Sequence, residues 1–261
     1  MERWRGKWAL VTGASAGIGQ SLAKQLAATG VNLVLTARRV DRLAQLASEL
    51  TARHAVQVEV CPADLTRPQA PEEIFGFTQQ KNLHIHVLIN NAGFGAYGEF
   101  HKTNRQRLLG MVQVNVASVV HLTHLFVPAM IERGSGYIMI VSSTAAFQPV
   151  PYLSTYGGTK GFDMLFAGSI AEELREYGVR VTALCPGSTV TEFHQVAGIS
   201  SSRRRRQESA EKVVRVGLRA LAQGEPLVIS GVRNRLAMEV QRALLRRMVA
   251  RVTGRMFRPS A

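Results

Sequence analysis

A tyrosine and a lysine four residues apart are the pair in this sequence best suited to move a proton. Tyr156 and Lys160 stand in the run Tyr-Gly-Gly-Thr-Lys. Residues at this spacing share one face of an α-helix, so the two side chains are expected to act as a unit. A free phenol has a pKa of roughly 10, and a lysine charge ~4 Å away would stabilise its phenolate by up to ~4 kcal/mol at an effective dielectric of ~20. The pair predicts proton transfer with a substrate oxygen, although by itself it also fits an ordinary surface pair.

A glycine-rich turn precedes the first helix-forming run. It reads Thr12-Gly13-Ala14-Ser15-Ala16-Gly17-Ile18-Gly19 and follows an apolar stretch. Glycines allow the backbone to approach a pyrophosphate, which the exposed N–H groups at a helix N-terminus attract. The spacing differs from the G-x-G-x-x-G fingerprint, and a plain glycine-rich turn is the alternative. The segment predicts a dinucleotide site.

The next apolar run ends in two arginines, Arg38 and Arg39, about twenty residues after the glycines. Folds that bind NAD usually place an acidic residue there, against the ribose 2′-hydroxyl. A guanidinium suits a 2′-phosphate, which a carboxylate would repel. Arg38 therefore favours NADP (NADPH) over NAD, with Arg39 or Ser15 as helpers. The alternative is that both arginines are solvated residues at the start of a helix.

Apolar, β-branched runs alternate with helix-period segments from Trp8 to Ile229. This alternation is typical of repeated βαβ units, in which parallel strands are joined by helices. We expect an α/β protein whose single domain is a Rossmann-like, doubly wound parallel sheet of seven strands with helices on both faces. The expected strands are Trp8–Thr12, Asn32–Thr36, Ala55–Val60, Val87–Asn90, Tyr137–Val141, Arg180–Leu184 and Leu227–Ile229.

Composition narrows the class of protein. The 261 residues are 46% hydrophobic and 19% charged, which suits one domain with a sizeable core. The formal charge of +14 invites nucleic-acid binding, but much of the excess lies in Arg203–Arg206 and in the tail from Arg233 to Arg258, so no nucleic-acid partner is expected. No secretory signal is visible and only two cysteines occur, which favours a cytoplasmic location.

Two further segments and the histidines complete the outline. Met111–Ile131 is apolar but carries polar groups and a proline, so it is interpreted as a buried helix rather than a membrane span. Residues 187–209 lack a strong apolar period and predict a mobile loop over a site. The histidine pairs, His84 with His86 and His121 with His124, lack a convergent third ligand, so no metal is expected.

Apolar residues and arginines interleave after Gly231, and this pattern predicts a basic amphipathic helix. We expect residues 1–231 to form the NADP-binding catalytic domain and residues 232–261 to be an extension packed on it or appended to it. The extension fits peripheral contact with an anionic membrane or docking of an acidic carrier protein. The alternative is a helix that covers the substrate pocket or extends a subunit interface with its arginines in solvent.

Taken together, the motifs resemble those of the short-chain dehydrogenase/reductase family, over about Trp8 to Ile229. The glycine segment, Asn90-Asn91-Ala92-Gly93, Asn115, Ser143, and the Tyr156–Lys160 run occur in the family's order, with Ser143 thirteen residues before Tyr156. The resemblance implies a catalytic tetrad of Asn115, Ser143, Tyr156 and Lys160. In it Tyr156 exchanges the proton, Ser143 holds the substrate oxygen, Lys160 also holds the nicotinamide ribose, and Asn115 orders a water that leads to Lys160.

The same resemblance implies further cofactor contacts. Asp64 matches the position that contacts adenine, although a plain turn role is equally consistent, and Asn91 matches the residue that steadies the sheet beside the cofactor. The segment Pro186–Thr191 resembles the one that binds the carboxamide, through the Thr189 backbone and the Thr191 hydroxyl. The expected cofactor-binding residues are Gly13, Ser15, Gly17, Ile18, Gly19, Arg38, Arg39, Asp64, Asn91, Gly93, Tyr156, Lys160, Pro186, Gly187, Thr189 and Thr191.

The substrate is expected beyond the carboxyl ends of the strands, between residues 144–154 and 187–209. The apolar side chains expected to form that mouth are Ala145, Ala146, Phe147, Pro149, Val150, Pro151, Tyr152, Phe193 and Val196. They fit an apolar carbonyl or alcohol substrate, and His194 is a further candidate for the lining. Three functions remain open: a reductase of small carbonyls, a 3-oxoacyl-thioester reductase, and a protein that senses NADP(H) without turnover. Resemblance to the family implies a homodimer or homotetramer that pairs through residues 104–132 and 155–176.

Overall fold

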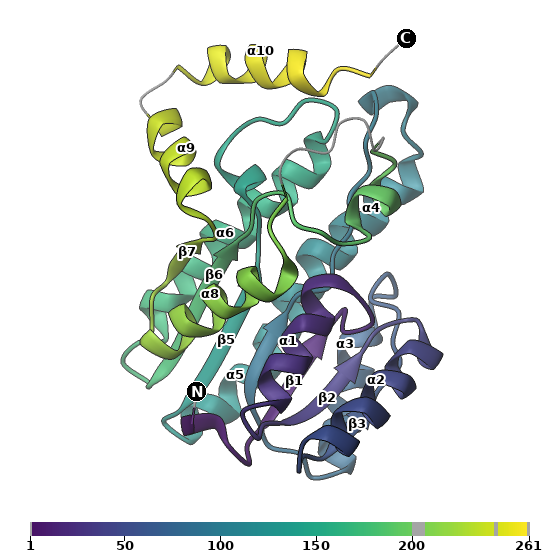
Figure 1. Cartoon of the computed structure of the whole chain (residues 1–261), viewed down its shortest axis with the longest axis vertical. Coiled ribbons are helices and arrows are strands. Elements are labelled where there is room, and N and C mark those ends of the chain that lie inside the picture. The colour runs from purple at the N-terminus through teal and green to yellow at the C-terminus, as the bar shows by residue number, and fades with distance from the viewer. Residues whose placement is uncertain (1, 200–206, 243–244, 260–261) are drawn as a thin grey trace.

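The centre of the computed structural model is one sheet of seven parallel strands in the order β3-β2-β1-β4-β5-β6-β7 (Figure 1). The structure describes residues 2–199, 207–242 and 245–259. The chain crosses from one half of the sheet to the other between β3 and β4, so β1 and β4 lie side by side at the switch point, where such sheets bind ligands. The strands are β1 (Trp8–Thr12), β2 (Asn32–Thr36), β3 (Val58–Val60), β4 (Ile85–Asn90), β5 (Gly136–Val141), β6 (Val179–Cys185) and β7 (Leu227–Ile229).

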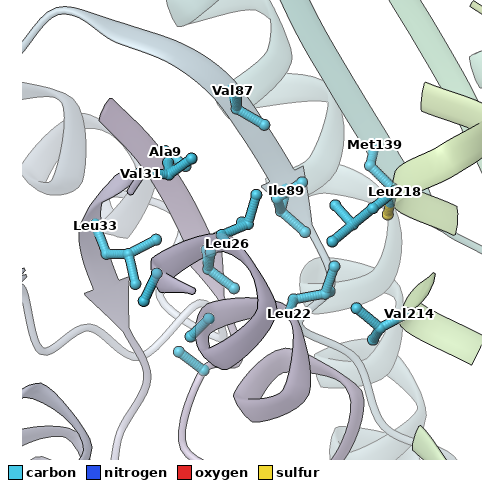
Figure 2. Packing of buried hydrophobic residues seen from close by; sticks show 14 of the residues in the cluster. Ala9, Leu22, Leu26, Val31, Leu33, Val87, Ile89, Met139, Val214 and Leu218 are labelled. Atoms are coloured by element: carbon cyan, nitrogen blue, oxygen red, sulfur yellow. The ribbon is translucent and has the colours of Figure 1, made fainter. Parts of the chain in front are cut away.

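One face of the sheet is covered by α1 (Gly17–Ala27), α2 (Val40–Arg53) and α8 (Ala210–Gln223). Side chains of a strand point to alternate faces, so Val87 and Ile89 of β4 face these helices whereas Leu88 faces away. Figure 2 shows Leu22 and Leu26 of α1 packed over these strands beside side chains from α8. Burial of this face fixes the register of the strands and so the positions of their carboxyl ends.

The other face is covered by α3 (Ala70–Gln80), the π-helical turn η3 (Gln113–Ala117), α5 (Ser118–Glu132) and α6 (Ser154–Glu173). Helix α4 (Arg105–Val112) leads into the turn η3 and packs against α6. By length and composition alone, Arg105–Glu132 would suffice to cross a membrane. In the structure its side chains Met111, Leu122 and Phe126 are buried, and the latter two belong to the core cluster on this face. The interpretation of this segment as a buried helix therefore agrees with its packing.

Short helical turns and the C-terminal segment complete the chain. The short turns are η1 (Glu2–Trp4), η2 (Phe100–Lys102), η4 (Thr144–Phe147) and α7 (Phe193–Ala197). The tail forms α9 (Val232–Arg242) and α10 (Arg246–Phe257), and α10 lies across the end of the molecule beyond the loops that carry α7 and η4 (Figure 1). The tail packs on the rest of the chain, because the side chains of Gln241 and Thr253 donate to the carbonyls of Phe147 and Pro149 at 2.9 and 3.0 Å.

The predicted α/β class, seven parallel strands and two helical layers are confirmed. Some details were wrong. The third strand begins at Val58 rather than Ala55, and the tail forms two helices rather than one. The fourth, fifth and sixth strands are one or two residues longer than predicted, because they begin at Ile85, Gly136 and Val179 and the sixth ends at Cys185. The predicted loop over residues 187–209 contains the short helix α7, and its arginine run Arg203–Arg206 lies outside the described residues.

Candidate active site

The glycine turn lies against the loop that follows β4. Gly13 and Gly17 have φ of +66° and +54°, the left-handed region that favours glycine. A Cβ at Gly19 would overlap the carbonyl oxygen of Gly13 and approach the Asn91 side-chain nitrogen to 2.5 Å. That nitrogen donates to the carbonyl of Thr12 at 2.7 Å, so the two loops are tied together.

The N-terminus of α1 opens into a cavity that is also lined by Tyr156 and Lys160. Ala16 precedes this helix, and the described residues provide no side-chain cap for its first turn, which also contains no acidic residue. Its free N–H groups therefore suit an anion, and the close backbone approach leaves the space that a pyrophosphate needs. The residues present fit a dinucleotide.

The two arginines after β2 have different surroundings. Arg38 is exposed at the edge of the cavity. Arg39 donates to the Ser15 hydroxyl at 3.2 Å and forms an ion pair with Glu192 at 2.7 Å. Arg42 contacts the other oxygen of Glu192 at 2.6 Å, so this carboxylate links α2 to the loop after β6. Because Arg39 and Arg42 are paired with Glu192, Arg38 is the one of these three arginines that can bind a phosphate without breaking an ion pair to Glu192.

A single cavity joins the glycine turn to the tyrosine and lysine. Its volume is about 490 Å³. Asp64 lies in its wall and also accepts the backbone N–H of Thr66 at 3.0 Å, so a turn role and a ligand contact are compatible. Apart from Asn115, all of the residues expected in the site line this cavity: Gly13, Ser15, Gly17, Ile18, Gly19, Arg38, Arg39, Asp64, Asn91, Gly93, Ser143, Tyr156, Lys160, Pro186, Gly187, Thr189 and Thr191.

Asn115 lies behind the cavity wall and is fully buried. Its side-chain nitrogen donates to the carbonyl of Phe94 and the hydroxyl of Thr159 at 3.1 and 3.0 Å, and its oxygen accepts the Phe94 N–H at 3.1 Å. The π-helical turn η3 directs the side chain inward, a distortion frequent at functional sites. In this structure Asn115 joins the loop after β4 to α6.

Tyr156 and Lys160 extend from the first turns of α6 toward the end of β5. Ser143, which follows β5, lies close to the Tyr156 hydroxyl and favours its ionised form. The Lys160 ammonium donates to the carbonyl of Val141 and to the carboxylate of Asp163, both at 2.8 Å. The ring of Phe193, from α7, stands 4.9 Å from the ring of Tyr156. Serine, tyrosine and lysine thus line one part of the same cavity.

The pKa of Tyr156 is raised, whereas the charge of Lys160 taken alone would lower it. Burial raises the pKa of Tyr156, and although the Lys160 charge and the Ser143 hydrogen bond act in the opposite direction, Asp163 adds to the rise. Burial would lower the pKa of Lys160, but the carboxylate of Asp163 more than offsets it and the pKa is raised. The lysine is therefore charged and the tyrosine is protonated near neutral pH.

Apolar side chains line the substrate end of the cavity. Ala145, Val150, Phe193 and Val196 line it as expected, and His194 does too. The expected residues that do not line it are Ala146, Phe147, Pro149, Pro151 and Tyr152. The carbonyls of Phe147 and Pro149 instead accept hydrogen bonds from the tail, which covers this segment.

Two contributions were missed by sequence reasoning. Phe257, at the end of α10, lines the cavity, and its carbonyl accepts the Tyr97 hydroxyl at 2.7 Å. Only tertiary packing brings it there, so no local signal could have found it. Asp163 lies three residues after Lys160, and this helical spacing was a signal that could have been used.

Comparisons with known proteins identify the class. A model of the short-chain dehydrogenase family, described as "short chain dehydrogenase", matches residues 7–200. Very-long-chain 3-oxoacyl-CoA reductase of Bos taurus is 34% identical over 197 residues, which are 74% of this chain and 62% of the bovine protein. The same name is carried by an Aspergillus clavatus protein that is 35% identical over 68% of this chain and 52% of its own length. The chain thus spans only about half to three fifths of these relatives.

Solved structures agree with the family match. A short-chain dehydrogenase from Sphingobium yanoikuyae, in complex with NADPH, is 31% identical and has a TM-score of 0.83, covering 90% of this chain and 93% of its own. The bulky-bulky ketone specific alcohol dehydrogenase from Comamonas testosteroni is 28% identical with a TM-score of 0.78, covering 90% and 92%. The chain belongs to the short-chain dehydrogenase family, a class of oxidoreductases.

Proposed function

We propose that the protein is an NADPH-dependent oxidoreductase that reduces the carbonyl group of an apolar substrate. The observation that carries the proposal is that Ser143, Tyr156 and Lys160 line the same cavity as the uncapped glycine-rich N-terminus of α1. A dinucleotide site alone would serve binding. A protonated phenol beside a hydroxyl and a buried ammonium adds the means for acid–base chemistry.

The bound nicotinamide would supply the hydride that the carbonyl carbon receives. Ser143 donates a hydrogen bond to the carbonyl oxygen, which holds and polarises it. Tyr156 gives its proton to that oxygen as the alcohol forms. Lys160 stabilises the phenolate left behind, and two of its three N–H groups are already engaged, which leaves one for the nicotinamide ribose. Alcohol oxidation follows the same steps in reverse.

Arg38 supports the choice of NADPH over NADH. The exposed guanidinium meets a 2′-phosphate in a charge-assisted contact worth about 1.5–3 kcal/mol. Arg38→Ala is expected to weaken NADPH binding roughly 10- to 100-fold and to leave NADH binding unchanged. Fluorescence titration of the two nucleotides measures this, with Arg42→Ala as the matched control on the same side of the cavity. Equal losses for both nucleotides would refute the assignment.

A 3-oxoacyl thioester is the second candidate substrate. Relatives about 34% identical carry the name very-long-chain 3-oxoacyl-CoA reductase, and the cavity of this chain ends in an apolar mouth. Helix α10, whose Phe257 lines the cavity, carries several arginines, and this positive charge near the mouth suits a thioester whose carrier is anionic.

A panel of aldehydes, ketones and 3-oxoacyl thioesters, each with NADPH and with NADH, tests the proposed function. NADPH consumption is expected, and a preference for thioesters over free ketones of equal chain length would select the second candidate. Tight NADPH binding with no consumption on any member of the panel would favour a protein that senses NADP(H) without turnover.

Exposed apolar side chains on α4 and α6 support a homodimer or homotetramer. Leu109 and Leu165 are 62% and 69% exposed, and Val112 and Phe162 accompany them. Such side chains on neighbouring helices suit an isologous interface. Sedimentation at micromolar concentration checks this assembly, and a monomer would contradict it. The cytoplasmic location stays a prediction that fits the two buried, unpaired cysteines, Cys61 and Cys185.

The outer face of α10 supports peripheral contact with an anionic membrane. Val249 and Thr253 face the protein, whereas Leu245, Met248, Val252 and Met256 form an outward stripe that is 40–57% exposed. The exposed arginines beside the stripe are Arg246, Arg247, Arg251 and Arg255. A second copy would bring these arginines against one another, whereas anionic lipid complements both the charge and the apolar stripe.

Flotation with vesicles tests this contact. The protein is expected to float with vesicles that contain anionic lipid, and the double variant Met248→Ser with Val252→Ser should remain at the bottom. Val40→Ser with Tyr177→Ser, which removes two exposed apolar side chains away from α10 and from the proposed subunit interface, is the control. Absence of flotation, or flotation that survives the α10 substitutions, would end the membrane proposal, and binding of an acidic carrier protein by the same face would replace it.

A further inference from the structure

A buried carboxylate stands beside the lysine of the site. Asp163 lies three residues after Lys160 on α6, and the two side chains are 1% and 7% exposed. Their ion pair is 2.8 Å long. Asp163 does not line the cavity, so it has no direct access to a ligand there. Its chemical effect on the site must pass through Lys160.

Stability does not account for this carboxylate. Its second oxygen, Oδ1, has no hydrogen-bond partner among the described residues, although it is buried. A buried charge loses its hydration, and a carboxylate with an unsatisfied oxygen recovers only part of that loss through one ion pair. An apolar side chain in this position would fill the same space between α6 and the sheet without that cost. The group is therefore expected to have a chemical use.

The geometry points to a charge-balancing role. Lys160 alone would place an uncompensated positive charge beside Tyr156 and favour the phenolate. Asp163 offsets part of that charge at 2.8 Å and also fixes the ammonium, whose other described contact is the carbonyl of Val141. We propose that Asp163 is a positioning residue that holds the Lys160 ammonium and weakens the effect of its charge on Tyr156, so that Tyr156 keeps its proton, as carbonyl reduction requires, up to a higher pH.

The other groups that face Tyr156 do not provide this balance. On α6 they are Lys160 and Asp163, on β6 it is Cys185, and after β5 it is the Ser143 hydroxyl. Burial raises the pKa of the Cys185 thiol to about 12, so this group is neutral in the working range. Asp163 is the negative charge among these groups, and it adds to the rise that burial gives the pKa of Tyr156.

Asp163→Asn tests the proposal because it removes the charge and keeps the shape. The inference rests on the proposed proton donation by Tyr156, so the first readout needs neither substrate nor cofactor: ultraviolet titration of the phenol, obtained by subtracting the same titration of Tyr156→Phe. The titration of Tyr156 is expected to move to lower pH by about one unit, the effect of one charge roughly 10 Å away at an effective dielectric of about 20.

The second readout is the pH profile of kcat/KM for the carbonyl and alcohol pair that the enzyme accepts. In Asp163→Asn, alcohol oxidation should begin at lower pH, so that its rate below the wild-type midpoint rises about tenfold. The rate of carbonyl reduction should begin to fall at a pH about one unit lower than in the wild-type protein. Glu172→Gln removes an exposed negative charge from the same helix and should leave both readouts at their wild-type values. Asp163→Leu, with folding checked by circular dichroism, repeats the test without a buried amide.

The outcomes distinguish the role of Asp163 from the proposed proton donation by Tyr156. An unchanged or upward shift of the Tyr156 titration in folded Asp163→Asn and Asp163→Leu overturns the role of Asp163 while leaving the proposed function intact. Full activity in Tyr156→Phe would instead overturn the proposed function. A fall in rate without any change in pH profile would show that Asp163 is purely structural and would also overturn the proposal.

Discussion

Tyr156 is held as an acid by its immediate surroundings. Burial disfavours the phenolate, and the neighbouring lysine is paired with Asp163, so its charge acts on the tyrosine only in part. The Ser143 hydroxyl reaches the same oxygen and favours the ionised form. The site therefore balances one cation against one anion within a single helical turn, and a tyrosine in this balance is present as the protonated phenol, the form that can give a proton to a carbonyl oxygen.

The pH dependence of the two directions follows from this balance. The pKa of Tyr156 is raised, so the protonated form persists through neutral pH and is lost only as the pH rises through that pKa. Carbonyl reduction is expected to stay level from neutral to mildly alkaline pH and then to fall, whereas alcohol oxidation should increase over the same alkaline range. Initial rates of both directions against pH measure this. A reduction rate that already declines below neutral pH would contradict the assignment.

At the scale of elements, the site depends on how closely the turn after β1 meets the loop after β4. Thr12 accepts two backbone N–H groups of that loop through its hydroxyl, each at 2.9 Å, and Asn91 completes the connection. The α1 N-terminus is therefore fixed against the edge of the sheet before any ligand binds. Preorganisation of this kind removes the cost of ordering the loops on binding.

Gly19→Ala tests this close approach. The added Cβ would overlap the Gly13 carbonyl, and backbone cannot move aside as a flexible side chain would. A loss of about 1–3 kcal/mol in the free energy of unfolding is expected, together with loss of NADPH binding. Gly76→Ala, in helix α3 with open space around its Cβ, should gain about 0.5–1 kcal/mol instead. Thermal unfolding compares the two, and equal stability would count against the close contact.

Phe257→Ala tests the contribution of α10 to the cavity. Removing a ring from the wall costs an apolar substrate about 1.5–3 kcal/mol of burial, so KM for bulky carbonyls should rise roughly 10- to 100-fold. NADPH affinity should not change. Met256→Ala, the adjacent residue on the outward stripe, is the control and should leave KM unaltered in the absence of vesicles. Equal KM values in both variants would place the substrate away from the tail.

The sequence best predicted those parts of the structure that depend on a single local pattern of residues. Strands buried on both faces appear as apolar runs, so β1 and β2 were predicted with their exact bounds. The bounds of β7, a partly exposed strand at the edge of the sheet, were also predicted exactly. The tail has the right amphipathic pattern, yet pattern alone could not show that α9 and α10 are separate helices or that Phe257 reaches the cavity. The spacing of Tyr156 and Lys160 predicted that they share one helix face, but the effect of Asp163 on them depends on burial, which only the structure shows.

At the scale of the whole molecule, the candidate site lies at one end of the sheet. The strands are all parallel, so their carboxyl ends gather the glycine turn, the tyrosine group and the apolar mouth at one edge of the sheet. The basic tail covers that same end, and α10 faces outward there (Figure 1). An apolar substrate that leaves a membrane would meet the mouth directly, while the interface expected on α4 and α6 involves other helices. The positive charge of the tail therefore lies at the same end of the molecule as the proposed substrate mouth.

Comparison of the parent enzyme with Tyr156→Phe tests the central claim most directly. NADPH consumption is measured with the best carbonyl substrate, and NADPH binding is measured by fluorescence in both proteins. The proposed proton donation predicts a loss of roughly 10²- to 10⁴-fold in kcat with unchanged NADPH affinity, because the phenylalanine keeps the ring and removes the proton donor. Turnover at the parent rate in the variant, with NADPH still bound, would contradict the account.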